Sequence, residues 1–428
     1  MMIRYLEMVR LSPFFIFIAA VLLACHTPGE LVNRNYAPCY RPDQQAASPP
    51  DFAFHQLDDS TVRVHVRINT HNLLFSRQDD GSFSAGCGVH IRIMRSYETP
   101  ALMDSCTFMH TMGMDQRDRY SDFSFTMGVH ADGELLALIR LTDINRGDFE
   151  ERYFRFRMGG IDERNSFLVI SSSGAPRYCD WLTTTDTFRI INRLESLQEV
   201  MVRYYDREFP LASPPFGIDN RVPFDYKPDS VFKMRIGAMF DMVFSKTGFY
   251  HISTDTLSRN GLTLFCFEEG YPKVVSTYQM LEPVRFLTVR SEFTAMKESS
   301  SLRKSMDDFW LARCDGSKDK SKMLIQKYYQ RVQWANRLFS SFTEGWRTDR
   351  GMLYIVMGAP NAVFRSSNIE TWVYGTVNSP TSLNFMFVKV DNPFTDNDYS
   401  LNRSPVYENA WYRAVDSWRQ GRAYNTID

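Results

Sequence analysis

The chain has 428 residues, of which 44% are hydrophobic and 23% are charged, so it is long enough to form several folded domains. Its formal net charge of −1 excludes nucleic-acid binding that depends on bulk electrostatic attraction. Aromatic residues make up 14% of the chain, a high share that favours β-strands and large packed contacts.

The N-terminal region has the layout of a secretory signal. Residues 14–23 have the sequence FFIFIAAVLL, follow Arg10 and end just before Cys25. This run is shorter than the roughly 20 apolar residues that a membrane-spanning helix needs. The sequence LLAC that ends at Cys25 resembles the bacterial lipobox, whose cysteine is acylated and becomes the mature N-terminus. We expect a signal peptide over residues 1–24 and lipidation of Cys25; the alternative is an ordinary signal peptide with a chance cysteine.

Between the signal and about residue 290, a short linker is followed by apolar and polar residues that alternate in a way typical of β-strands. Residues 25–50 are polar and rich in proline, which predicts a linker. Apolar and polar residues then alternate over 51–162, as in VRVHVRI at 62–68, and this predicts an antiparallel β-sandwich. A second region, 163–290, contains further strand-like runs and predicts another small β-sandwich-like domain.

Six cysteines follow Cys25, an even number that permits up to three disulfide bonds in an exported protein. The pair that we consider first is Cys87 with Cys106, because both lie in one predicted β region. The alternative is that the thiols are free and buried, as cysteines often are. The cysteine spacing matches no zinc site, so we expect neither a metal nor a cofactor.

Residues 291–428 change in character and predict an α+β domain. Apolar residues recur at helical spacing first, and strand-like runs follow before a last helix. The expected helices cover 302–310, 324–342 and 410–418, and the expected strands cover 353–357, 371–374 and 383–388.

The heptad GWRTDRG at 345–351 resembles the signature of the GWxTD-domain proteins. The resemblance is specific from about residue 270 to the C-terminus and includes GAP at 358–360 and ETWVY at 370–374. The family consists of envelope proteins without an established activity, so it implies architecture and location rather than mechanism. The motif residues are Gly345, Trp346, Thr348, Asp349, Arg350, Gly351, Gly358, Pro360, Glu370, Trp372 and Tyr374.

We interpret the motif residues as structural. Gly345 is expected to end the preceding helix in a left-handed conformation, and Trp346 to anchor the turn in the core. Thr348 and Asp349 are expected to bond local backbone groups, and Arg350 to pair with Asp349 or Glu370.

The alternative interpretation makes the same charges catalytic. Asp349, Arg350 and Glu370 would then share a deep pocket, with the two carboxylates acting as acid and base. All eight histidines lie at or before His251, so the C-terminal domain lacks the commonest general base. No catalytic residue is assigned.

These observations predict a non-enzymatic lipoprotein, anchored to the outer membrane, that acts as a binding or scaffold component of an envelope protein assembly. The membrane, through the lipid anchor, and other envelope proteins would be its partners, and nucleic acid would not. Some surface-exported lipoproteins resemble one another in carrying a cluster of acidic residues just after the lipidated cysteine. Residues 26–30, HTPGE, form no such cluster, which favours a protein that faces the periplasm. The alternative function is an envelope hydrolase that acts on a polymer with carboxylates of the C-terminal domain.

Overall fold

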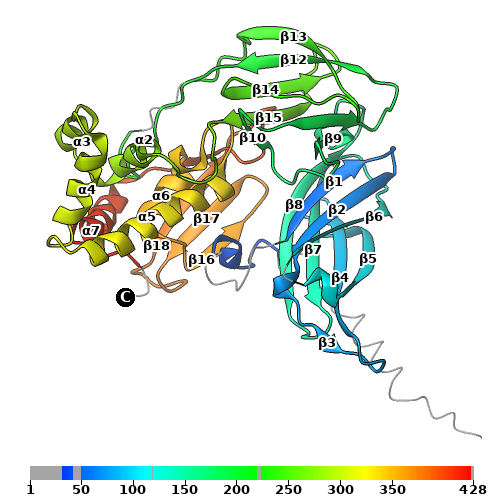
Figure 1. Cartoon of the computed structure of the whole chain (residues 1–428), viewed down its shortest axis with the longest axis horizontal. Helices are drawn as coiled ribbons and strands as arrows, with labels where there is room; N and C mark the ends of the chain where they lie inside the picture. The colour runs from blue at the N-terminus through cyan, green and yellow to red at the C-terminus, as the bar shows by residue number, and fades with distance from the viewer. Residues whose placement is uncertain (1–30, 42–49, 118, 219–222, 426–428) are drawn as a thin grey trace, which may run out of the picture.

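A computed structural model describes residues 31–41, 50–117, 119–218 and 223–425 (Figure 1). The expected signal peptide and Cys25 lie outside the described residues. Two antiparallel β-rich domains precede an α+β domain, which confirms the predicted fold class. In Figure 1 the first domain lies at lower right, the second at the top and the helical domain at left.

The first domain packs two sheets face to face. One sheet has the order β1-β2-β6, and in the other β3-β4-β7-β8 is extended by β5, which pairs with β4 on the side opposite to β7. Valines 62, 64 and 66 of β2 are buried at alternate positions, as the sequence predicts. The strands are β1 (Asp51–Gln56), β2 (Thr61–Asn69), β3 (Ser76–Arg77), β4 (Phe83–Met94), β5 (Leu102–Gly113), β6 (Tyr120–Gly128), β7 (Gly133–Asp143) and β8 (Phe149–Met158).

The second domain has one larger and one smaller sheet. Their orders are β10-β15-β14-β12-β13 and β11-β9, and every pairing is antiparallel except the parallel pair β10 and β15. The strands are β9 (Phe167–Ser171), β10 (Trp181–Thr183), β11 (Phe188–Asn192), β12 (Glu199–Tyr205), β13 (Ser230–Arg235), β14 (Gly248–Ser253) and β15 (Leu262–Phe267).

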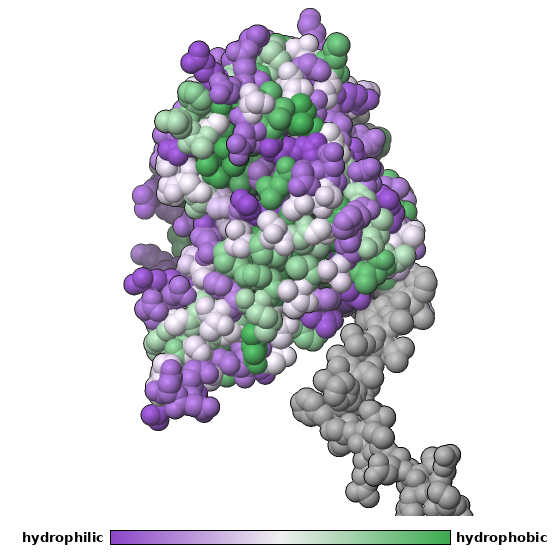
Figure 2. Space-filling view, turned by 90° about the vertical axis from the view of Figure 1, so that its right-hand side faces the viewer, coloured by the Kyte–Doolittle hydropathy of each residue, from purple (hydrophilic) through white to green (hydrophobic). Residues whose placement is uncertain are grey.

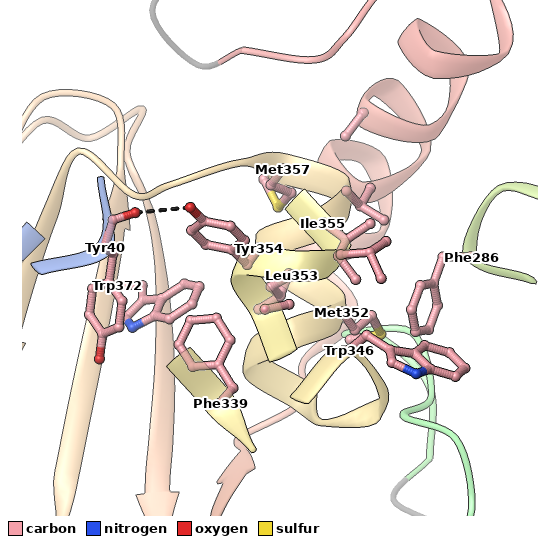
Figure 3. Packing of buried hydrophobic residues seen from close by; sticks show 14 of the residues in the cluster. Tyr40, Phe286, Phe339, Trp346, Met352, Leu353, Tyr354, Ile355, Met357 and Trp372 are labelled. Atoms are coloured by element: carbon pink, nitrogen blue, oxygen red, sulfur yellow. Dashed lines mark hydrogen bonds between the residues drawn. The ribbon is translucent and has the colours of Figure 1, made fainter. Parts of the chain in front are cut away.

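In the C-terminal domain, helices cover an antiparallel sheet of order β16-β17-β18-β19. Figure 3 shows α6 between this sheet and the ring pair of Trp346 and Phe286. The helices are α2 (Thr277–Leu281), α3 (Arg290–Lys297), α4 (Leu302–Ala312), α5 (Lys318–Phe339), α6 (Asp349–Met357) and α7 (Glu408–Arg419). The strands are β16 (Ala362–Arg365), β17 (Ile369–Tyr374), β18 (Leu383–Lys389) and β19 (Tyr399–Leu401).

The strand predicted at 353–357 is wrong, because these residues form the second half of α6. All nine residues of the helix are buried, so no polar face interrupts its apolar run. A short, fully buried helix and a buried strand have the same hydropathy pattern. The deciding signal is the N-cap: the Thr348 side chain accepts the amide N–H of Gly351.

Part of the segment predicted as a linker is packed into the fold. Residues 31–41, within the range 25–50, include the short 3₁₀ helix η1 (Ala37–Tyr40). Tyr36 is buried and its amide donates to the carbonyl of Val363 at 2.7 Å. Tyr354 on α6 donates its hydroxyl to the carbonyl of Tyr40 at 3.0 Å, the dashed line in Figure 3. The N-terminal segment therefore belongs to the core of the C-terminal domain.

The predicted disulfide between Cys87 and Cys106 is not formed, and both thiols are free. The two cysteines lie on the paired strands β4 and β5, but Cys87 faces His110 and Cys106 faces Ile91. This register separates them by four residues, about 13 Å along the strands. A disulfide requires Cα atoms within about 7 Å of each other.

Candidate functional site

The signature begins in η7 (Gly345–Arg347), where the chain passes directly against the backbone of α5. A Cβ atom on Gly345 would overlap the carbonyl oxygen of Ala335, and one on Gly351 would overlap the carbonyl oxygen of Gly345. Helix α5 already ends at Phe339, and the φ angle of Gly345 is not positive. The expected left-handed helix end at Gly345 is therefore wrong; the two glycines allow close backbone approach.

Trp346 anchors this turn in the core, with 8% of its surface exposed. Its ring meets that of Phe286 edge to face, with centroids 6.1 Å apart (Figure 3). Its amide donates to the Asn336 side-chain oxygen on α5 at 3.1 Å. Thr348 then caps α6: its Oγ1 accepts the Gly351 amide at 3.1 Å and donates to the Gly345 carbonyl at 2.8 Å.

Asp349 is buried and forms an ion pair with Arg403. The two guanidinium nitrogens of Arg403 lie 2.5 Å from Oδ1 and 3.3 Å from Oδ2 of Asp349. The same carboxylate accepts the amide of Leu401 on β19 at 2.8 Å. Asp349 therefore joins the start of α6 to the last strand of the sheet rather than bonding only local backbone.

Arg350, the next residue, turns to a different partner. Its Nη1 lies 3.7 Å from Oε2 of Glu370, and its Nη2 donates to the backbone carbonyl of Asn397 at 2.9 Å. Its guanidinium lies over the rings of Tyr399 at 4.1 Å and Phe339 at 5.1 Å. Of the two partners expected for Arg350, the structure selects Glu370.

Glu370 is the centre of a buried polar cluster. Its Oε1 accepts the hydroxyl of Tyr40 at 2.7 Å and the indole N–H of Trp372 at 2.6 Å, and its Oε2 accepts Nε of Arg365 at 3.0 Å. Burial alone raises the pKa of the Glu370 carboxyl. Arg365 and Arg350, with these hydrogen bonds, outweigh burial and hold the pKa below its ordinary value. The carboxylate therefore stays ionised in the interior.

The remaining motif residues fix the junction between α6 and the sheet. Gly358 ends α6 with a φ of 85°, a conformation that favours glycine. The hydroxyl of Tyr374 donates to the Gly358 carbonyl at 2.8 Å, and Arg41 donates to the Pro360 carbonyl at 2.8 Å. Trp372 is fully buried. These contacts hold α6, the sheet and the N-terminal segment together.

The same region also holds the second domain. Arg347, within the signature, donates to the carbonyl of Phe209 at 2.9 Å, and its own carbonyl accepts the amide of Ala212 at 3.2 Å. Arg403 donates to the carbonyl of Ser213 at 3.3 Å. The signature and the partner of its aspartate thus form a clamp on the extended segment that follows β12.

Comparison with known proteins identifies this region. Residues 248–420 match the family model of the GWxTD domain. The chain carries a GWxTD domain. The match begins at β14, so the family's unit includes two strands of the second sheet as well as the α+β body.

The other comparisons add little. No curated protein matches the sequence. Among solved structures, a transglutaminase of red sea bream is similar over 54% of this chain and 33% of that chain, with 10% sequence identity and a TM-score of 0.18. The chain thus spans about a third of that protein, and the likeness is too weak to support an inference about fold or activity.

The charged residues of the GWxTD signature do not share one pocket. Asp349 lines a cavity of about 700 Å³ between the second domain and the GWxTD domain. Arg350 and Glu370 line another cavity, of about 550 Å³, at the junction of all three domains. The arrangement therefore does not place the two carboxylates as an acid and base about one substrate.

Within the described residues, no group of three histidine, cysteine or acidic side chains is placed to hold a metal ion. The described part of the chain also contains no helix with the length and apolarity needed to cross a bilayer.

Sequence reasoning missed Tyr40 of the N-terminal segment and both Arg365 and Arg403 of the GWxTD domain. The role of Arg365 could have been predicted from the sequence. Arg365 lies directly opposite Glu370 in the hairpin of β16 and β17, and opposite charges at such positions pair. The roles of Tyr40 and Arg403 could not, since each reaches its partner only through the tertiary fold.

Proposed function

We propose that the chain is a non-enzymatic lipoprotein, anchored to the outer membrane through Cys25 and facing the periplasm, that acts as a binding or scaffold component of an envelope protein assembly. One observation carries this proposal: the charges of the GWxTD signature form two separate buried clusters, Asp349 with Arg403 and Arg350 with Glu370. Charges that are paired and hydrogen-bonded in this way hold elements together.

The surface of the first domain supports a docking role. β5 is a 12-residue strand that pairs only with β4 among the described strands, so its outer edge offers unpaired backbone groups. Leu102, Met103 and Met109 on this strand are exposed. Hydrophobic side chains gather over the first domain in the lower half of Figure 2. An edge strand of this kind accepts an added strand from another protein.

The connection between the domains supports a scaffold role. The N-terminal segment joins the first domain to the GWxTD domain: Arg34 pairs with Glu151 on β8, while Tyr40 bonds Glu370 on β17. The clamp of Arg347 on Phe209 holds the second domain. A tethered protein whose domains are fixed in this way presents its surfaces to partners in a constant arrangement.

The test isolates the full-length chain from membranes together with its partners. It compares the parent with two variants, each of which replaces one exposed methionine. Met109 on β5 and Met323 on α5 are 57% and 60% exposed, so charge at either position should leave the fold intact. We expect Met109→Glu to lose a partner that the parent and Met323→Glu retain. Equal recovery of every partner by both variants would contradict docking at the β5 edge.

The alternative, an envelope hydrolase, has its own test. Asp349→Asn or Glu370→Gln would abolish turnover of an envelope polymer by the purified chain. Polymer turnover by the parent chain that either variant loses while it is still folded would favour the enzyme over the scaffold.

A further inference from the structure

One end of the first domain exposes a group of large apolar side chains that the docking proposal does not use. They lie around β3, at the lower end of this domain in Figure 1. Between 41% and 57% of the surface of each side chain is exposed. These residues, which we call the apolar rim, are Leu74, Phe83, Met114, Ile144 and Phe149. Apolar side chains that gather on a surface mark a contact with another protein or with a membrane.

The rim is assembled from separate parts of the chain. Strands β4 and β8 begin at this end of the sheet, at Phe83 and Phe149, and β5 and β7 finish there, just before Met114 and Ile144. The rim is therefore a property of the folded domain and does not depend on one loop.

Two polar side chains hold the loops of the rim in place. Asp143, which is 5% exposed, accepts the amide of Leu74 at 2.8 Å. Asn145 donates to the carbonyls of Leu74 at 2.7 Å and Ser84 at 2.9 Å. The backbone around Leu74 and Ile144 is thus fixed by hydrogen bonds while their side chains stay exposed.

The N-terminal segment enters the fold next to this rim. The ring of Tyr36 meets that of Tyr153 on β8, with centroids 4.8 Å apart. Arg34 pairs with Glu151, which is two residues nearer to Phe149 on the same strand. Traced toward its N-terminus, the segment therefore runs along β8 toward the rim.

Only five residues separate Cys25 from the start of the described segment at Leu31. Leu31 is 2% exposed, and its carbonyl accepts the amide of Arg34 at 3.3 Å. An extended chain advances at most about 3.5 Å per residue, so Leu31 lies within roughly 20 Å of Cys25. Acyl chains on Cys25 would therefore hold the surface next to Leu31 close to the bilayer.

We propose that the apolar rim inserts into the membrane surface to which Cys25 tethers the chain, an inference that rests on the lipid anchor proposed above. Apolar side chains of this kind bury about 5–10 Å deep, at the boundary between head groups and acyl chains. The rim would be a second membrane contact beside the lipid, and the two together would fix how the three domains stand on the bilayer.

The charges around the rim indicate that this contact is apolar. Within 73–83, 113–117 and 143–149 there are three arginines and four exposed aspartates, so no basic patch attracts anionic lipid. Insertion should therefore occur on neutral phosphatidylcholine and should not weaken as salt is added.

The test uses the full-length chain, purified without partners, in vesicles of phosphatidylcholine with brominated acyl chains. Bromine quenches a tryptophan that reaches the acyl region. Phe149→Trp adds a tryptophan at the rim, and Val406→Trp, on the GWxTD domain, is the matched control. These side chains are 57% and 68% exposed, so both variants should fold like the parent. The seven native tryptophans are common to all three proteins.

We expect bromine to lower the emission that Phe149→Trp adds by about half, as for a side chain at the acyl boundary, and to leave the emission that Val406→Trp adds unchanged. Adding Ile144→Glu to Phe149→Trp should abolish this quenching, because a charge at the rim opposes insertion. Adding Met323→Glu, which places the same charge on α5, should not.

The mass of the purified chain reports acylation separately. An acylated chain in which bromine quenches residues 149 and 406 equally, or neither, would overturn the inference and leave the anchor standing. Shielding of residue 149 from aqueous acrylamide without bromine quenching would assign the rim to a second copy of the chain and would also overturn it. A chain without acyl groups would overturn the anchor, and this inference with it.

Discussion

Asp349 and Arg403 form a two-point ion pair across 54 positions of the chain, with Arg403 nitrogens 2.5 Å and 3.3 Å from the two carboxylate oxygens. This pair ties the first turn of α6 to the segment after β19. The adjacent Arg350 reaches Glu370 instead. Two neighbouring charges of one signature therefore stabilise two different junctions.

The first prediction concerns the signature glycines. Gly345→Ala and Gly351→Ala should each lower the free energy of unfolding by about 1–3 kcal/mol or more, because the added Cβ would overlap backbone. In an open helix, Gly351→Ala would instead stabilise by about 1 kcal/mol. Gly160→Ala, where a Cβ meets nothing, is the control. Chemical denaturation compares them, and equal stabilities would refute close approach as the reason for these glycines.

The second prediction concerns Trp346. Its ring is buried against Phe286, so Trp346→Ala should cost about 3–5 kcal/mol of stability. Trp346→Phe keeps part of the ring contact and should lose less. A melting temperature of the alanine variant equal to that of the parent would mean that the side chain is exposed and available for recognition.

These glycines illustrate the limit of sequence reasoning here. The alternating strands such as β2 and the long helix α5 were predictable, since one face of each is buried and the other is not. The sequence of α6 predicts a strand at 353–357 because these residues are all hydrophobic, and none of them is exposed. The role of Gly345 depends on the carbonyl of Ala335, and no local pattern reports that contact.

The ion pairs of the signature also could not be predicted fully from the sequence. The sequence allowed two partners for Arg350 and could not choose between them, because the choice depends on which strand faces α6. Tyr40 lay in a polar, proline-bearing stretch that had the composition of a linker, yet it donates to Glu370 in the core. Composition describes the average of a segment and misses a single buried side chain.

The third prediction is a pH dependence of the Glu370 cluster. Because the folded pKa is below the ordinary value of 4.5, the unfolded chain binds a proton at pH values where the folded chain does not. The stability that the carboxylate contributes is therefore present above about pH 4.5 and is lost as the pH falls through the lowered pKa.

Glu370→Gln should accordingly cost about 3–5 kcal/mol at neutral pH, since it leaves buried arginines without their partner. The difference from the parent should shrink below pH 4.5 or so. Free energies of unfolding measured for both proteins from pH 7 to 3 check this. A difference that stays constant over the whole range would contradict an ionised Glu370.

The fourth prediction concerns the anchor, which lies outside the described residues. If Cys25 carries the lipid as proposed, Cys25→Ser should release the protein from membranes or leave it unprocessed, because the acyl chains would attach to that thiol. Cys39→Ser is the matched control and should stay membrane-bound. Detergent partitioning measures both, and unchanged partitioning of Cys25→Ser would refute lipidation at this position.

The last prediction concerns Asp349, Arg350 and Arg403 and follows from their burial in pairs. Asp349→Asn should destabilise the chain by roughly 3–5 kcal/mol, because it leaves the buried Arg403 guanidinium without its carboxylate. Arg350→Met should also destabilise the chain, but by less, because it removes the hydrogen bond to Asn397 while Arg365 still pairs with Glu370. Asp349→Asn and Arg403→Met should also be coupled in a double-mutant cycle, more strongly than Asp349→Asn and Arg350→Met.

Thermal unfolding of the Asp349→Asn and Arg350→Met chains, with complementation of a deletion strain beside it, tests the structural account of the signature most directly. The account predicts a lowered unfolding temperature in both variants. Two variants as stable as the parent that still fail to complement would contradict it and would favour catalysis or ligand binding at the signature.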